Sequence, residues 1–167
     1  MQTQVQLITP CLWFDRNAEE AANFYTGIFP NSGMDEIARY GKAGFEIHGM
    51  PEGMVLTVKF TLAGQPFMAL NGGPLFQFNE AISFQVSCGT QEELDHYWQK
   101  LGEGGDPEAQ VCGWLKDRYG VSWQITPRVL GQMLVDPDIA RRERVMTALH
   151  QMRTLDIAGL QRAFDGS

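Results

Sequence analysis

Two helix-like segments match each other position by position, and this internal repeat restricts the possible fold more than any other feature. Residues 17–28, NAEEAANFYTGI, and residues 90–101, TQEELDHYWQKL, correspond at a shift of 73 residues. Asn17 and Thr90 are suitable N-caps, and each is followed three residues later by a Glu that can close a capping box. The spacing i, i+3, i+4, i+7 predicts one buried stripe per helix, formed by Ala21, Phe24, Tyr25, Ile28 and by Leu94, Tyr97, Trp98, Leu101. The chain is expected to contain two copies of one structural unit.

Strand-like segments flank both helices in the same order. LITPCLWF precedes the first helix and AISFQVS the second, while VLTVKFTLAGQPFMAL and QVCGWLKDRYGVSWQIT predict a β-hairpin after each. The hairpins align at a shift of 56, with Gly64 matching Gly120, so the first copy carries 17 additional residues between helix and hairpin. These are expected within GMDEIARYGKAGFEIHGMPEG, whose glycines indicate a flexible excursion.

The segment NGGP, residues 71–74, lies where the first copy ends. A phosphate-binding loop places its glycines between a strand and a helix N-terminus. Here a strand-like segment follows, so we interpret NGGP as a joint. Phe76 and Phe78 after the joint could serve as a lid or pack against a partner or the tail.

The predicted organisation is a single domain, 1–167. It comprises a first module at about 5–71, a joint at 72–75, a second module at about 80–127 and a helical tail at 128–167. In the tail, Asp136 and Pro137 are expected to begin a helix, with Ile139 and Val145 among its inward-facing residues. A second short helix is expected at about 157–164.

Composition excludes several classes of function. The net charge of −7, with 13 scattered Lys and Arg, argues against nucleic-acid binding. The apolar runs are too short for a membrane span, and MQTQVQLITP does not have the pattern of a secretory signal. Three cysteines without CxxC spacing indicate no disulfide framework. A cytoplasmic protein is the default expectation.

The blocks PCLWFDRNAEEAANFYTGIFPNS, GQPFMALNGGPLFQFNEAISFQV and CGWLKDRYGVSWQITPRVLGQMLVDPD resemble the PhnB-like branch of the vicinal oxygen chelate superfamily. This superfamily includes glyoxalase I, bleomycin-resistance proteins and extradiol dioxygenases, and sequences of this branch often carry the name 3-demethylubiquinone-9 3-methyltransferase domain. The resemblance implies an α+β fold of tandem βαβββ modules that form curved mixed sheets, followed here by a helical tail. It also implies a small-molecule site in a cup and a homodimer.

Enzymes of this superfamily place a divalent metal in the cup, with His and Glu as the usual ligands. The corresponding positions here are Thr9 or Pro10, residues 81–83, Met68 and Gln124. A lone amide beside a thioether does not hold a catalytic metal, so we expect no metal and no cofactor. His48, His96 and His150 share no ligand spacing and are expected to be structural.

Other chemistry finds little support in the sequence. The first strand–helix turn, FDRNAEEA, lacks the glycines typical of methyl-donor binding to a doubly wound sheet. No sequence feature supports methyl transfer, and no nucleophilic triad can be assembled around Cys112.

Large apolar and amide side chains on the predicted strands are the candidates for ligand binding, although core or outer-face positions are the simpler interpretation for many of them. These candidates are Trp13, Met68, Asn71, Gln85, Trp114, Trp123 and Gln124. Asp117 is expected to form the second hairpin's turn. Lys116 or Arg118 could reach an anionic ligand, but a solvated turn is the simpler interpretation.

These observations favour a homodimeric, metal-free, small-molecule-binding protein. The alternative is an enzyme of unknown reaction acting on a planar or carbonyl-bearing metabolite. A third hypothesis is a structural role in which the protein's own side chains fill both cups.

Overall fold

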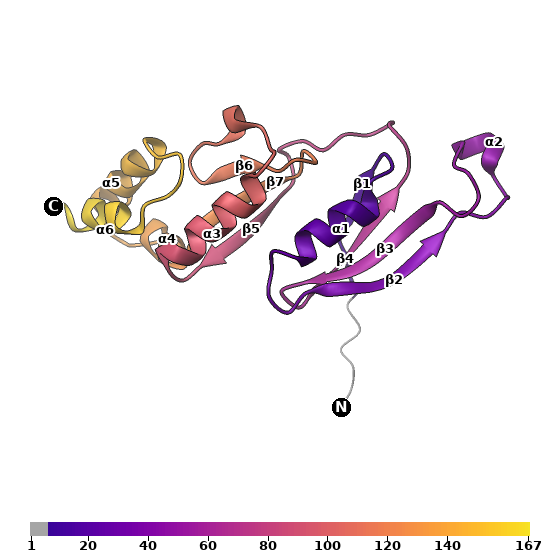
Figure 1. Cartoon of the computed structure of the whole chain (residues 1–167). Coiled ribbons are helices and arrows are strands. Elements are labelled where there is room, and N and C mark those ends of the chain that lie inside the picture. The colour runs from indigo at the N-terminus through magenta and orange to yellow at the C-terminus, as the bar shows by residue number, and fades with distance from the viewer. Residues whose placement is uncertain (1–6) are drawn as a thin grey trace. The chain divides into compact units, whose positions relative to one another are not determined.

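The structure is a computed structural model that describes residues 7–167. Two compact units make up the chain, and the division falls between Gln77 and Phe78, shortly after the NGGP segment (Figure 1). The predicted start of the first module, near residue 5, lies outside the described residues. Residues 1–6 of the segment MQTQVQLITP, for which no secretory signal was expected, lie outside them as well.

The first unit has the βαβββ order, with a short helix inserted. Its elements are β1 (Cys11–Phe14), α1 (Ala18–Thr26), β2 (Gly33–Arg39), α2 (Phe45–His48), β3 (Val55–Leu62) and β4 (Gln65–Asn71). The sheet order is β1-β4-β3-β2; β1 and β4 are parallel, and the other pairs are antiparallel. The stretch predicted as a flexible excursion instead contains β2, an edge strand. Because most of its side chains are exposed, β2 lacks the apolar alternation that would have marked it as a strand.

Helix α1 lies across one face of this sheet (Figure 1). The apolar stripe is confirmed at Ala21 and Tyr25, which are fully buried. The Tyr25 ring stacks on Phe60 of β3, and Phe60 stacks on Phe67 of β4, with ring centroids 6.4 and 5.5 Å apart. The hairpin joining β3 and β4 turns at Ala63 and Gly64. Their φ angles of 48° and 82° suit a two-residue turn with both residues left-handed.

Asn71, at the end of β4, holds the N-terminus of α1. Its Oδ1 accepts a hydrogen bond from the Ala18 N–H at 2.9 Å, and its Nδ2 donates to the Val55 carbonyl at 3.0 Å. The side chain of Asn17 makes no capping bond, so this part of the predicted capping box does not form. Asn17 has φ −112° and ψ 26°, outside the extended region in which an N-cap side chain reaches the first turn.

The NGGP segment is tied to β1. Trp13 Nε1 donates to the Gly73 carbonyl at 2.9 Å, and the Phe76 ring meets the indole edge-on with centroids 5.0 Å apart. A Cβ on Gly72 would lie 2.2 Å from Trp13 Cζ2. Gly72 is therefore required because the backbone passes directly against the indole.

The second unit repeats this plan with a smaller sheet. Its elements are β5 (Ser83–Cys88), α3 (Gln91–Gly102), the 3-10 turn η1 (Pro107–Ala109), β6 (Trp114–Lys116), β7 (Ser122–Pro127), α4 (Arg128–Leu134), α5 (Ile139–His150) and α6 (Ile157–Asp165). The sheet order is β5-β7-β6, with β5 parallel and β6 antiparallel to β7. The predicted α+β class with mixed sheets and a helical tail is confirmed. In the described part of the second copy, however, the module has three strands.

Helix α3 covers one face of this second sheet (Figure 1). Thr90 is its N-cap, as predicted: the Glu93 N–H donates to Thr90 Oγ1 at 3.2 Å, and the Glu93 carboxylate accepts from the Gly89 N–H at 2.6 Å. Leu94 and Leu101 are fully buried, which confirms the ends of the predicted stripe.

Asp117 organises the turn between β6 and β7, which confirms its prediction as a turn former. The carboxylate is buried and accepts from the Tyr119 and Val121 N–H groups at 2.8 and 3.0 Å. Its other oxygen accepts from Trp123 Nε1 at 2.8 Å. One side chain thus fixes both the turn and the buried indole.

The tail differs in detail from its prediction. Helix α5 is capped by Asp138, which accepts from the Ala140 N–H at 2.9 Å, whereas Asp136 accepts from the Asp138 N–H at 2.8 Å. The helix therefore begins two residues later than predicted, and Ile139 is 62% exposed instead of inward-facing. Val145 is fully buried, and α6 is confirmed. Helix α4 was not predicted.

Backbone hydrogen bonds fasten the tail to the second hairpin. The Cys112 and Gly113 N–H groups donate to the Met152 and Arg153 carbonyls, both at 3.0 Å. This attachment places the end of α5 beside β6. Among residues 7–167, no helix is both long and apolar enough to cross a bilayer.

Replacing Asn71 by Leu keeps the side-chain volume but leaves the Ala18 N–H and the Val55 carbonyl without their buried partner. We expect a loss of about 2–4 kcal/mol in the free energy of unfolding, measured by denaturant titration. Asn17→Ala is the control and should change this quantity by less than about 0.5 kcal/mol, because the side chain makes no capping bond. Equal losses in the two variants would contradict the assigned cap.

Gly72→Ala forces the Trp13 indole out of its position against the backbone. We expect a loss of about 1–3 kcal/mol in the free energy of unfolding, together with a shift in tryptophan fluorescence. Gly33→Ala is a matched control because a Cβ there meets nothing within 4 Å. A neutral Gly72→Ala substitution would show that the close approach is wrong.

Candidate functional site

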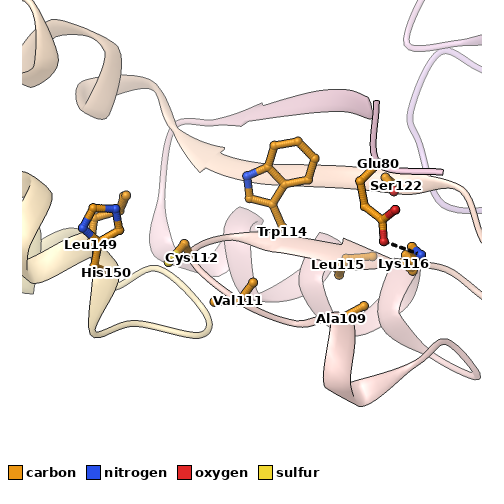
Figure 2. Close-up of a pocket in the computed structure, with 10 residues that line it drawn as sticks. All are labelled: Glu80, Ala109, Val111, Cys112, Trp114, Leu115, Lys116, Ser122, Leu149 and His150. Carbon is orange, nitrogen blue, oxygen red and sulfur yellow. Dashed lines mark ion pairs between the residues drawn. The ribbon is translucent and has the colours of Figure 1, made fainter. Parts of the chain in front are cut away.

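A pocket of about 520 Å³ opens on the sheet of the second unit (Figure 2). Strand β6, the segment before it, the segment before β5, the start of β7 and the end of α5 contribute to it. The lining residues are Glu80, Ala109, Val111, Cys112, Trp114, Leu115, Lys116, Ser122, Leu149 and His150.

Strand alternation determines which side chains reach this face. Trp123 and Ile125 of β7 are buried on the α3 side. Successive strand residues point to opposite faces, so Ser122 and Gln124 belong to the opposite, open face. The register places Lys116 beside Ser122 and Trp114 beside Gln124. From these two rows, Trp114, Lys116 and Ser122 line the pocket.

One end of the pocket, called the polar end here, holds an ion pair and a serine hydroxyl. Glu80, Lys116 and Ser122 lie together there, while Cys112, Leu149 and His150 lie at the other end, with Trp114 between the two groups (Figure 2). Lys116 Nζ forms an ion pair with Glu80 Oε1. The hydrogen bond from Lys116 lowers the pKa of the Glu80 carboxyl, so Glu80 is an anion at neutral pH.

Ser122 carries the unusual feature of the site. The residue is 1% exposed, and its Oγ has no hydrogen-bond partner within the described residues. Buried hydroxyls nearly always have a partner, because an unpaired one is costly. The Ser122 hydroxyl is thus a donor and acceptor that the described residues leave unused.

Three of the seven predicted ligand-binding residues share one row on this face. Gln85 of β5 pairs with Gln124 of β7, which pairs with Trp114 of β6. Trp114 lines the pocket. Gln124 Nε2 donates to Ser83 Oγ at 2.9 Å, and Gln85 is exposed.

Trp123 lies behind the sheet, away from this row. Its side chain is buried, its Nε1 donates to Asp117, and its ring lies 5.5 Å from that of Phe84. These contacts give it a place in the core of the second unit.

The other three candidates belong to the first unit. Trp13 is hydrogen-bonded to the NGGP segment, and both polar atoms of the Asn71 side chain are bonded within the protein. Met68 is half-buried on the open face of its sheet, beside Cys11 and Lys59.

Ser122 and Glu80 are not among the residues predicted from the sequence, and His150 was expected to be structural. Ser122 had a detectable signal, because it stands two residues before Gln124 and so shares its face. Glu80 lies outside the strands, and His150 reaches the pocket only because the tail docks on the hairpin. Arg118, weighed beside Lys116 as an anion contact, instead donates to the Glu103 carbonyl at 3.2 Å.

The residues at the positions equivalent to metal ligands do not suit a divalent cation. Thr9 or Pro10, residues 81–83, Met68 and Gln124 offer no imidazole and no carboxylate. Within residues 7–167, no three His, Cys, Asp or Glu side chains are grouped to hold a metal. His48 is used locally, since its Nδ1 accepts from the Met50 N–H at 2.9 Å.

Cys88 is poorly suited to nucleophilic chemistry. Burial of the thiol, aided by the nearby Glu93 carboxylate, raises its pKa to about 11. The reactive thiolate is therefore scarce at neutral pH.

Comparison with known proteins places the chain in a family. Residues 6–126 match the family model described as 3-demethylubiquinone-9 3-methyltransferase. The PhnB protein from Bacillus cereus is 41% identical, with a TM-score of 0.62, over 73% of this chain and 99% of that one. Protein PA1353 from Pseudomonas aeruginosa is 19% identical, with a TM-score of 0.54, over 72% of this chain and 96% of that one, and shows the fold alone. No curated protein sequence matches the chain.

The family model spans well over half of the chain, and the Bacillus cereus structure matches it over nearly its own full length. These matches agree with the paired helix-and-sheet units and with the three sequence blocks noted above. The chain belongs to the 3-demethylubiquinone-9 3-methyltransferase-like family, the PhnB-like branch of the vicinal oxygen chelate superfamily.

Proposed function

We propose that this protein binds a small molecule, without a metal ion, in the pocket of its second unit. The observation that carries the proposal is the buried, unpartnered Ser122 Oγ at one end of an otherwise largely apolar pocket of about 520 Å³. Pockets of this size with a few well-placed polar groups are typical of small-molecule sites.

The wall of the pocket favours a ligand with a planar apolar part. The half-buried indole of Trp114 presents an aromatic surface, and Val111 and Leu149 add aliphatic contacts. Aromatic rings stack favourably on such a surface. The polar end then orients the ligand by hydrogen bonding.

Methyl transfer, which the family's description names, is not part of this proposal. The N-terminus of α1 is the nearest equivalent of the glycine-rich turn that binds cofactors in doubly wound sheets. Its first amide, that of Ala18, is already bonded to Asn71. That helix end therefore has one donor fewer to offer a cofactor.

We also propose that the protein forms a homodimer. Several large apolar side chains are more than half exposed in the single chain: Leu75, Phe76, Ile82, Val135 and Ile139. A second copy would cover some of these side chains, and native mass spectrometry measures the oligomeric state directly.

Trp114→Ala removes the proposed stacking surface. We expect the affinity for a neutral planar probe, 2-naphthamide, to fall by about tenfold, measured by isothermal titration calorimetry. Trp98→Phe is the control because Trp98 belongs to α3, which covers the opposite face of the sheet. Unchanged affinity in Trp114→Ala would show that the probe binds elsewhere.

Removing metal ions should leave binding intact. We expect the same dissociation constant for 2-naphthamide before and after dialysis against EDTA, and no change on adding Zn²⁺ or Mn²⁺. The physical reason is that the residues at the ligand positions cannot hold a divalent ion. Binding that disappears with EDTA and returns with one metal would contradict the proposal.

A further inference from the structure

We propose that the polar end of this pocket recognises the carboxylate of an aromatic carboxylic acid, and that Glu80 pairs with Lys116 until the ligand binds. The inference rests on the proposed function, because it assumes a small molecule in the same pocket. It adds the ligand's chemical class and an exchange of partners at Lys116.

Lys116 is the fixed member of the ion pair. It lies on β6, where its backbone pairs with Ser122 of β7, and its side chain is 27% exposed. Glu80 precedes β5 in a segment without strand pairing, and its side chain is 60% exposed. The cation is therefore held by the sheet, and the carboxylate is the partner that can leave.

Ser122 supplies the second contact. The register puts it directly beside Lys116 on the open face, and its buried Oγ has no partner. A serine hydroxyl can donate one hydrogen bond. A carboxylate placed here would accept from Lys116 with one oxygen and from Ser122 with the other, which removes the cost of the unpaired hydroxyl.

The donor set favours a carboxylate over other charged groups. Among the described lining residues, Lys116 is the single Lys or Arg, whereas a phosphate dianion calls for several donors. A ligand ammonium would meet Lys116 as a like charge. The apolar wall around Trp114 begins next to this end (Figure 2), so the carboxylate is attached to an aromatic ring.

Exchanging Glu80 for the ligand has a small cost. An ion pair with one well-exposed partner is weak in water, and the released Glu80 side chain regains hydration. Glu80 therefore acts as an internal competitor that keeps Lys116 neutralised in a chain of net charge −7.

The test compares two probes of nearly equal shape, 2-naphthoate and 2-naphthamide, by isothermal titration calorimetry on the full chain. The wild-type protein should bind the carboxylate about tenfold tighter than the amide, as expected for hydrogen bonds to a charged group. Lys116→Met and Ser122→Ala should each reduce this preference, and Lys116→Arg should retain most of it. Circular dichroism melting confirms that each variant is folded.

Glu80→Gln is the decisive variant. Removing the competing carboxylate should raise the affinity for 2-naphthoate by about threefold and leave the affinity for 2-naphthamide unchanged. If Glu80 had a purely structural role, the affinity for both probes would be equal to that of the wild type or lower. Weaker or unchanged naphthoate binding in Glu80→Gln overturns the inference. Equal affinities of the two probes in every variant also overturn it but leave the proposed function standing. If neither probe binds, the proposed function fails for planar aromatic ligands, and the inference fails with it.

Discussion

Each unit of this protein depends on one constraint: a single helix covers only one face of its sheet. Because side chains alternate along a strand, burying Phe60 and Phe67 under α1, or Trp123 and Ile125 under α3, commits the intervening residues to the other face. The proposed small-molecule site lies on that open face of the second unit. Asn71 in the first unit and Asp117 in the second use buried polar bonds to fasten helix and turn to the sheet.

In the second unit the same alternation assembles the pocket. Two adjacent rows cross the sheet, one with Lys116 and Ser122 and the other with Trp114 and Gln124. The tail adds Leu149 and His150 because the segment directly after α5 is hydrogen-bonded to Cys112 and Gly113, just before β6. The charged end and the aromatic wall thus arise from Lys116 and Trp114, only two positions apart on β6. Under the proposed function, this arrangement would orient a ligand without a metal.

Much of the fold was predictable because the repeat is local and periodic. The helix stripes, the hairpins and the Thr90 cap follow from spacing alone. The cap of α1 was not predictable, because it comes from Asn71, which is distant in the chain. The edge strand β2 was not predictable for another reason: its side chains are mostly exposed and show no apolar alternation. At the site, Trp114 and Gln124 could be proposed from residue type. Glu80 and His150 could not, because loop and tail conformations bring them to the pocket. Trp123, like Trp114, is a tryptophan on a predicted strand. Only the strand register shows that the two side chains lie on opposite faces of the sheet.

We propose that the open face of the second unit receives the ligand. Amide chemical-shift mapping by NMR during a titration with 2-naphthoate reports directly where the probe binds. The largest shifts should fall on β6, the start of β7, the indole N–H of Trp114 and the end of α5. Shifts concentrated on β1 and β4 of the first unit would contradict it and would move the site to the sheet that carries Met68.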